Sequence, residues 1–354
     1  MRAVRYYGQK DIRVENIDAP VAGKGQVLID IAWCGICGTD LHEYLEGPIF
    51  VPKPGHPHPI TGEEPPVTLG HEFSGVVAAL GEGVDDLEVG QHVVVEPYIL
   101  PEDVDPNEPG PYNLHPDVNF IGLAGRGGGL SEHIAVERRW VHPISNDVPL
   151  DEAALIEPLS VAHHAFVASE AGEGDVALIG GAGPIGVLTA AVAKAYGCTV
   201  VVSELSELRR QRALDAGVAD YAIDPSSQDL KEEILKITDG KGADVAFEAT
   251  SVNVVLDQLV DCLKLQGVLV VESIWSKKAN LDIHAVVMKE LTVRGIIGYA
   301  HDHEQTIKLV EEGKVDLKPF ITGKIGFDGV VDEGFDTLIN RNETAVKILV
   351  SPEL

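Results

Sequence analysis

The sequence is poor in cysteine and in basic residues, and it has no long apolar run. Four cysteines in 354 residues argue against a disulfide framework and favour a reducing compartment. No segment approaches the roughly 20 consecutive apolar residues that a membrane-spanning helix needs. The first residues also lack the apolar stretch of a signal peptide. We therefore expect a cytoplasmic protein.

The shortage of basic residues limits the possible partners. The chain has 56 acidic and 27 basic residues, which gives a formal charge of -29. Such a charge repels phosphate backbones and anionic lipid head groups. We therefore expect no nucleic acid and no membrane partner. An acidic surface is also compatible with a salt-rich cytoplasm, and this point stays open.

A chain of this length predicts two domains, because one hydrophobic core seldom organises so many residues. Residues 1 to 152 are rich in glycine, proline and short β-type runs, which indicates a mostly β domain with long loops. Between residues 153 and 298, strands alternate with helices, as in the doubly wound parallel sheet of an α/β domain. Residues 299 to 354 are irregular and are expected to rejoin the first domain.

The expected elements of the second domain follow from local patterns. Asp151 is expected to cap a helix that carries Glu157 just before Pro158. A further helix is expected over residues 252 to 265. The six expected strands are Val176 to Ile179, Thr199 to Ser203, Ala219 to Ile223, Asp244 to Phe247, Val268 to Val271 and Leu291 to Ile297.

A glycine loop follows the first of these strands. The stretch Gly181-Ala182-Gly183-Pro184-Ile185-Gly186 has the spacing Gly-x-Gly-x-x-Gly between a strand and a helix. In this context Gly181 permits a tight turn, Gly183 lets a pyrophosphate approach the backbone, and Gly186 lets helix and strand pack closely. The pattern predicts a dinucleotide site; a glycine turn without a nucleotide is the alternative.

An acidic residue indicates which dinucleotide binds. Glu204 ends the second strand, where a carboxylate accepts the ribose hydroxyls and repels a 2′-phosphate. NAD is therefore expected rather than NADP, although Arg209 or Arg210 would weaken this choice if it faced the ribose. Thr250 is included in the predicted cofactor site.

The stretch from Trp33 to His42 carries two thiols, a hydroxyl, a carboxylate and an imidazole. By itself it could be half of a zinc ribbon, a redox dithiol or a proton-transfer site. Further along the chain stand His71, Glu72 and Glu157. Catalytic zinc takes three ligands from Cys, His and Asp/Glu and keeps one position open. Cys37 and these three residues can provide such a set.

Together these motifs resemble the zinc-dependent medium-chain dehydrogenases over nearly the whole chain. The resemblance rests on the residues 34 to 42, Gly70-His71-Glu72, residues 157 to 162 and the glycine loop. It implies a GroES-like catalytic domain beside a Rossmann domain, with Cys37 and His71 as zinc ligands. It leaves the third ligand open between Glu72 and Glu157. The usual structural zinc is not expected, because Pro97 to Asn119 contains no cysteine.

The resemblance also implies the activity. We expect an NAD-dependent alcohol dehydrogenase in which Thr39 lies next to the substrate oxygen and His42 continues a proton path, with Glu157 at the same centre. In the alternative, Thr39 caps a helix starting near Asp40 and His42 lies on its surface. Stretches such as Leu41 to Phe50 are similar to the branch that acts on diols. The expected substrates are 2,3-butanediol and acetoin, with sorbitol or another polyol as the alternative.

Two other readings compete with this one. A zinc-free quinone reductase would share the nucleotide domain, but such proteins lack the thiol, imidazole and carboxylate set. An NAD-binding sensor or structural protein would keep the fold without turnover. Association into a homodimer or homotetramer is expected, because in this family the last strand of the sheet, Leu291 to Ile297, joins its counterpart across a two-fold axis.

Overall fold

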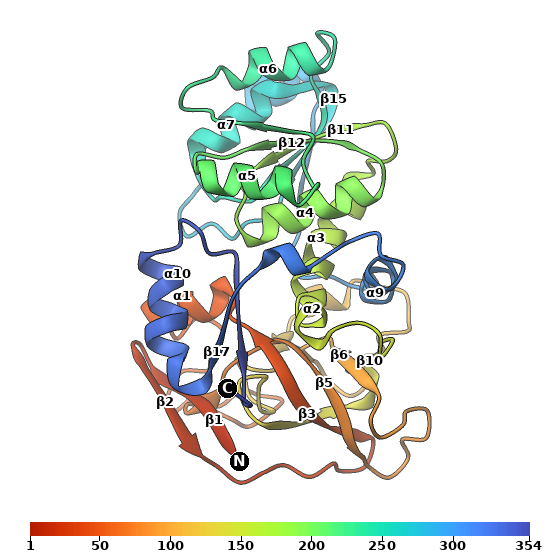
Figure 1. The fold of residues 1–354 in the computed structure, drawn as a ribbon, viewed down its shortest axis with the longest axis vertical. Helices are drawn as coiled ribbons and strands as arrows, with labels where there is room; N and C mark the ends of the chain where they lie inside the picture. The colour runs from red at the N-terminus through yellow and green to blue at the C-terminus, as the bar shows by residue number, and fades with distance from the viewer. The chain divides into compact units, whose positions relative to one another are not determined.

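The computed structural model describes residues 1–354 and divides into two units (Figure 1). The first unit contains Met1–Glu157, His303–Glu311 and Phe320–Leu354. The second contains Pro158–Asp302 and Glu312–Pro319. The first unit is thus assembled from separate parts of the chain.

A seven-stranded sheet forms the frame of the first unit, with the strand order β10-β6-β5-β3-β18-β17 and with β9 also paired to β3. Along β3, Val27, Ile29 and Ile31 are buried at alternate positions, which is the pattern of a strand with one face in the core. The strands of this sheet are β3 (Gln26–Gly35), β5 (Glu72–Leu80), β6 (His92–Val95), β9 (His133–Glu137), β10 (Val141–Pro143), β17 (Ile321–Gly326) and β18 (Lys347–Ser351).

Two small sheets and several short helices complete this unit. The smaller sheets have the orders β2-β1-β4 and β7-β8. Their strands are β1 (Arg2–Gly8), β2 (Asp11–Asn16), β4 (Val67–Thr68), β7 (Tyr98–Ile99) and β8 (Asn119–Phe120). The helices are α1 (Gly38–Glu46), α2 (Leu150–Ala153), α9 (His303–Glu311) and α10 (Asp336–Asn340), with short turns at η1 (Tyr112–Leu114), η2 (Arg138–Trp140), η4 (Phe327–Gly329) and the π-helical η5 (Val330–Phe335). The turn η3 (Lys318–Phe320) belongs to this unit only by its last residue.

The proline-rich segment from residue 97 to 119 is held by side chains of η2. The Arg139 guanidinium donates hydrogen bonds to the backbone carbonyls of Leu100, Pro101 and Val104. The Trp140 ring is 1% exposed and lies 5.7 Å from the rings of Tyr98 and of Tyr112. The Arg139 guanidinium and a cluster of aromatic rings therefore order a segment that has little regular structure.

The second unit is built on a six-stranded parallel sheet with the order β13-β12-β11-β14-β15-β16. Strand order reverses between β11 and β14, as in a doubly wound Rossmann sheet. The strands are β11 (Val176–Gly180), β12 (Thr199–Ser203), β13 (Tyr221–Ile223), β14 (Ala243–Glu248), β15 (Leu263–Val271) and β16 (Thr292–Gly295). The helices are α3 (Ile156–Ser169), whose first two residues belong to the first unit, α4 (Pro184–Ala195), α5 (Glu207–Asp215), α6 (Leu230–Ile237), α7 (Asn253–Cys262) and α8 (Ile283–Lys289).

The structure confirms the predicted fold class, a mostly β part and a doubly wound α/β part. Two local predictions were wrong. The helix expected to extend to residue 265 ends at Cys262, because Leu263 pairs with Ala243 and begins strand β15. Asp151 is not a helix cap: Pro149 is the N-cap of α2, and a separate helix, α3, begins at Ile156. None of the helices is long and apolar enough to cross a membrane.

Candidate metal centre and nucleotide site

The Cys37 thiol is positioned by the junction of β3 and α1. Cys37 is the N-cap of α1, and its backbone N–H donates to Asp40 Oδ2 at 2.9 Å. This closes the first turn of the helix by a capping interaction. The Asp40 carboxylate is completely buried in the process.

His71 comes from the turn that leads into β5. The preceding Gly70 has a φ of +98°, and a Cβ there would lie 2.6 Å from Cys34 Sγ, so the turn requires glycine. The ring atom His71 Nδ1 lies 3.6 Å from Asp40 Oδ1. Both atoms are buried without a hydrogen-bond partner. Asp40 is therefore placed to hold the imidazole in one orientation, as carboxylates do behind metal-bound histidines. The sequence analysis did not assign this role to Asp40.

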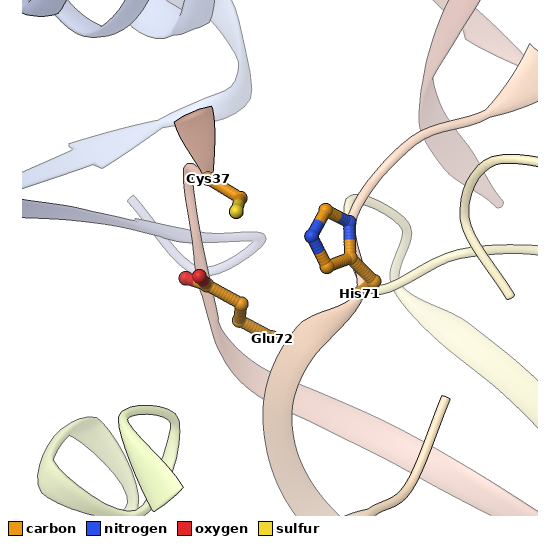
Figure 2. Close-up of side chains that lie close together, drawn as sticks. All are labelled: Cys37, His71 and Glu72. Atoms are coloured by element: carbon orange, nitrogen blue, oxygen red, sulfur yellow. The ribbon is translucent and has the colours of Figure 1, made fainter. Parts of the chain in front are cut away.

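The structure brings three of the four predicted ligands together. Ligand atoms of Cys37, His71 and Glu72 lie within 4.8 Å of one another, and Figure 2 shows the three side chains around one space. A thiol, an imidazole and a carboxylate are the donor set that zinc prefers. Burial, and next the neighbouring Glu72, raise the pKa of the Cys37 thiol well above its usual range. A divalent cation would offset exactly this cost by replacing the proton, so the residues fit zinc.

Glu72 has a partner that sequence reasoning missed. Lys347 Nζ donates to both oxygens of Glu72, at 2.8 and 2.7 Å, and both side chains are almost completely buried. Burial alone would lower the pKa of Lys347, but Glu72 and the Cys37 thiol outweigh it and raise the pKa. The signal available in the sequence was a lysine in the apolar run Ala345 to Val350, because buried cations are rare without a specific partner.

The fourth predicted ligand, Glu157, lies in the first turn of α3 and is 8% exposed. It is not part of the group of Cys37, His71 and Glu72. Its charge nevertheless helps to raise the pKa of Lys347. Glu72 and Glu157, the two alternatives for the third ligand, thus both raise the pKa of Lys347.

The predicted proton path begins beside the thiol. Thr39 is half-buried on α1, with its Oγ1 3.7 Å from Cys37 Sγ. Thr39 is not a helix cap, because α1 begins at Gly38 with Cys37 as N-cap. His42, one turn later, is exposed. The surface position expected for His42 in the alternative reading is therefore observed, whereas the capping role of Thr39 is not.

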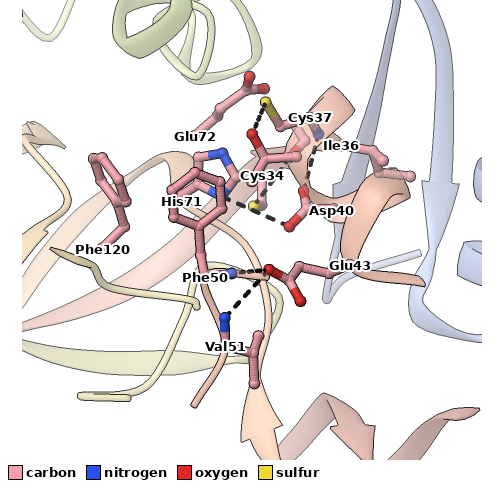
Figure 3. Close-up of polar contacts among 12 residues, drawn as sticks. Cys34, Ile36, Cys37, Asp40, Glu43, Phe50, Val51, His71, Glu72 and Phe120 are labelled. Carbon is pink, nitrogen blue, oxygen red and sulfur yellow. Dashed lines mark hydrogen bonds and ion pairs between the residues drawn. The ribbon is translucent and has the colours of Figure 1, made fainter. Parts of the chain in front are cut away.

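A second buried carboxylate on α1 orders the loop that follows the helix. Glu43 is completely buried, and its carboxylate accepts hydrogen bonds from the backbone N–H groups of Phe50 and Val51 (Figure 3). It also accepts one from the backbone N–H of Ile49. Phe50 in turn packs against Phe120, with 6.1 Å between the ring centroids. Sequence analysis did not single out Glu43, since a buried acid on a helix looks the same as an exposed one in sequence.

The glycine loop of the second unit has the geometry of a phosphate-binding turn. Gly181 has a φ of +98°, and a Cβ at Gly186 would lie 2.1 Å from the Gly181 carbonyl oxygen. Around Gly183, by contrast, a Cβ would meet nothing within 4 Å. Pro184 and Ile185 then begin α4, whose N-terminus carries free backbone N–H groups. The turn is tight where the fold needs it and open where a phosphate would approach.

The other predicted cofactor residues surround this loop. Glu204 accepts hydrogen bonds from the backbone N–H groups of Ala182 and Ser206, both at 2.8 Å. Arg210 donates to the backbone carbonyls of Glu204 and Leu205 and lies 3.5 Å from Asp224.

Arg209 and Thr250, the last two predicted cofactor residues, also lie near the glycine loop or the helix α5. Arg209 stands in the first turn of α5, where its backbone N–H bonds to the Ser206 cap. Thr250 lies against Gly181, because its methyl group would meet a Cβ there at 2.5 Å.

The chain is similar to known proteins over its full length. A family model described as "Alcohol dehydrogenase GroES-like domain" matches residues 23–146, and one described as "Zinc-binding dehydrogenase" matches residues 184–312. The chain is 63% identical to an (R,R)-butanediol dehydrogenase of Neisseria gonorrhoeae over the full length of both chains. It is 44% identical to an (R,R)-butanediol dehydrogenase of Bacillus subtilis, covering 99% of this chain and all of the relative.

Solved structures agree with these matches. The crystal structure of 2R,3R-butanediol dehydrogenase from Bacillus subtilis has a TM-score of 0.93 and 43% identity, with 99% of each chain covered. A putative zinc-binding dehydrogenase from Sinorhizobium meliloti, bound to NADP, has a TM-score of 0.86 and 28% identity over 99% of each chain. A protein from Escherichia coli described as a short chain alcohol dehydrogenase, complexed with NADH, has a TM-score of 0.85 and 25% identity over 99% of each chain.

Proposed function

The chain belongs to the zinc-dependent medium-chain alcohol dehydrogenases, and from this premise we propose that it transfers a hydride between NAD and a secondary alcohol, with (R,R)-2,3-butanediol and acetoin as its substrate pair. The observation that carries the proposal is the buried group of Cys37, His71 and Glu72, which offers a zinc donor set. The identity of 63% over the full length supports the choice of substrate.

Cys37 and His71 would hold the metal, with Asp40 keeping the imidazole in place. When bound there, zinc supplies Lewis-acid polarisation of a substrate oxygen. Lys347 already pairs with Glu72, which supports Glu157 as the third ligand whenever Glu72 stays with the lysine. One zinc per chain is expected, because Arg139 and the aromatic cluster around Trp140 already order the segment from residue 97 to 119.

Thr39 and His42 would carry the proton. The Thr39 hydroxyl lies beside the thiol and can both accept and donate a hydrogen bond, which suits it to hold the substrate hydroxyl and pass on its proton. His42 is exposed and can exchange that proton with water.

NAD is the proposed cofactor of the second unit. Glu204 is fixed by two backbone N–H groups at the end of β12, where an acid accepts ribose hydroxyls. Arg210 is engaged with backbone carbonyls, which supports NAD over NADP because a 2′-phosphate would then meet a carboxylate instead of a free guanidinium.

Domain boundaries and association complete the proposal. Residues 1–152 and 299–354 would form the catalytic domain, and 153–298 the NAD-binding domain. Strand β16 lies at the edge of its sheet, with Val293 and Ile297 partly exposed, which favours pairing with a second copy into a homodimer or homotetramer. The four free thiols, three of them buried, favour a reducing cytoplasm.

A substrate panel tests the activity. Purified protein is assayed for NADH absorbance with butanediol stereoisomers and with sorbitol, and for NADH consumption with acetoin, in parallel with NADP. We expect turnover of (R,R)-2,3-butanediol with NAD and its loss after chelation. No absorbance change with any diol, polyol or simple alcohol would reject the enzyme. Faster turnover of sorbitol than of 2,3-butanediol would instead support a polyol dehydrogenase.

Elemental analysis tests the metal content separately. We expect about one equivalent of zinc per chain, as a single catalytic site requires. Two equivalents would overturn the proposal of a single site without touching the proposed activity.

A further inference from the structure

Two buried carboxylates stand side by side at the carboxyl edge of the parallel sheet. Glu248 is the last residue of β14 and is completely buried. Glu272 directly follows the neighbouring strand β15 and is 7% exposed. The two residues are linked through the backbone, since the N–H of Glu272 donates to the carbonyl of Glu248 at 3.1 Å. Burying two acids together is costly unless each finds donors or a cation.

Their hydrogen bonding is unequal. Glu248 accepts from the backbone N–H and the hydroxyl of Thr250, at 2.7 and 2.6 Å, and from the indole of Trp275 at 3.1 Å. It also accepts from Ser251 and Ser273. Glu272 receives one donor for its two oxygens, the Thr189 hydroxyl, at 2.9 and 3.1 Å. Glu248 is thus a satisfied structural group, whereas Glu272 lacks the partners that a buried carboxylate needs.

The position of Glu272 relates it to the predicted nucleotide. In doubly wound sheets the ligand lies outside the carboxyl ends of the strands, at the point where strand order reverses. Glu204 at the end of β12 is placed for the adenosine ribose, and the glycine loop at the end of β11 for the pyrophosphate. The remaining half of a dinucleotide then extends across the reversal toward β14 and β15. Glu272 stands at that end, tied through Thr189 to the helix that begins at the glycine loop.

We propose that Glu272 lies beside the nicotinamide end of the bound dinucleotide and favours the oxidised, cationic ring over the reduced, neutral ring. The proposal rests on the proposed function, since it takes NAD as the ligand. The oxidised nicotinamide supplies the positive charge that the buried carboxyl lacks in the protein alone.

Proton release should accompany this recognition. Burial, with the nearby Glu248 adding to it, raises the pKa of Glu272 to about 8, so the free protein holds this carboxyl protonated at pH 7. The groups that face it are Glu248 from β14 and the uncharged Thr189 hydroxyl from α4. A cation placed nearby favours the carboxylate, so the O–H bond breaks and the proton passes to buffer. The neutral reduced ring leaves the proton in place.

Calorimetric titration of the holoenzyme tests the proposal. NAD⁺ and NADH are each titrated at pH 7 in two buffers of different ionisation enthalpy, which gives the number of protons released, and at pH 8.5 for the ratio of affinities. The variants are Glu272→Gln and the matched control Glu232→Gln, which removes the same charge from an exposed position of the same unit. Because the metal centre is intact in every variant, its own proton release cancels in the comparison.

We expect the wild type and Glu232→Gln to release up to about one more proton with NAD⁺ than with NADH. In Glu272→Gln this difference should vanish, and the preference for NAD⁺ at pH 8.5 should fall about tenfold, the equivalent of one pKa unit. Thr189→Val keeps the Glu272 carboxyl but removes its hydrogen-bond donor, so the proton release on NAD⁺ binding should persist to higher pH. If Glu272→Gln does not fold, this variant provides the test.

Two results would overturn the proposal. If Glu272→Gln keeps the wild-type proton release and affinity ratio, the proposal fails while the proposed function stands. If the wild type binds neither dinucleotide, both fail together.

Discussion

The Thr39 hydroxyl is the residue on which the proposed proton transfer depends most directly. Thr39→Ala should reduce turnover of 2,3-butanediol by roughly 10²- to 10⁴-fold, the usual contribution of a positioned proton-transfer group. Thr39→Ser keeps the hydroxyl and should stay within about tenfold of the wild type. Steady-state kinetics, together with the zinc content of each variant, measure the effect. Equal turnover in Thr39→Ala with zinc retained would remove Thr39 from the mechanism.

Glu272 also predicts how stability depends on pH. Burial raises its pKa in the folded protein to about 8, from an ordinary value of 4.5, so the folded state binds the proton more tightly than the unfolded chain does. The wild type should therefore lose stability as the pH rises from about 4.5 through 8, by a total of roughly 5 kcal/mol at about 1.4 kcal/mol per unit. Glu272→Gln has no proton to lose, and this decline should be absent from it.

Denaturant unfolding at pH 5.5 and pH 9 measures this difference. From pH 5.5 to pH 9 the free energy of unfolding of Glu272→Gln should increase relative to that of the wild type. The control Glu232→Gln, at an exposed position, should show the same pH dependence as the wild type. Parallel curves for the wild type and Glu272→Gln would show that Glu272 titrates normally.

At the scale of single elements, α1 combines three tasks. Its N-cap is the Cys37 thiol, its third residue Asp40 faces His71, and Glu43 one turn later binds the loop at residues 49 to 51. The two acids are three positions apart and therefore lie on the same face of the helix. A shift of α1 would move the proposed metal ligand and the loop carrying Phe50 together.

Arg139 is expected to determine the order of the proline-rich segment. Arg139→Lys replaces the two separated nitrogens of a planar guanidinium by one nitrogen on a flexible stem, which cannot reproduce the geometry of the hydrogen bonds to the carbonyls of Leu100, Pro101 and Val104. Limited proteolysis of the native protein should then cut between residues 100 and 110 at least about tenfold faster, since about 1.4 kcal/mol suffices for that factor.

Arg138→Lys is the matched control for this experiment. Arg138 is the neighbouring residue, and its fork pairs with Asp86 instead of the segment. It should be cut at the wild-type rate. Equal rates for both variants would show that the aromatic cluster around Trp140 is sufficient to order the segment.

Local patterns predicted some elements well and others not at all. The glycine loop and the six strands of the second unit were predictable, because each depends on a short run of residues between clear turn signals. The pairing of Glu72 with Lys347 was not, because these residues are 275 positions apart and meet only when β18 pairs with β3. The helix cap expected at Asp151 was wrong because α2 already begins at Leu150 with Pro149 as its N-cap, which leaves Asp151 inside a short helix that is separate from α3.

At the scale of the whole molecule, the charge of -29 predicts a response to salt. Self-repulsion is screened over about 10 Å at 0.1 M salt and about 3 Å at 1 M. Raising sodium chloride from 0.05 to 1 M should therefore increase the Tm by roughly 3 °C, or about 2 kcal/mol for a chain of this size. Thermal unfolding followed by circular dichroism measures the shift. Potassium chloride should act alike, and a constant or falling Tm would show that self-repulsion is not limiting.

The strand β18 has a consequence for how the protein is made. Glu72 and Lys347 are separated by 275 positions, and at roughly 5–20 residues per second the ribosome needs on the order of 15 to 55 s to reach the lysine after the glutamate. During that interval Cys37, His71 and Glu72 have already been synthesised, while the ammonium group that later occupies Glu72 does not yet exist. The partner of the buried Glu72 carboxylate therefore becomes available only when the chain is nearly complete, so this ion pair forms among the last contacts of the first unit.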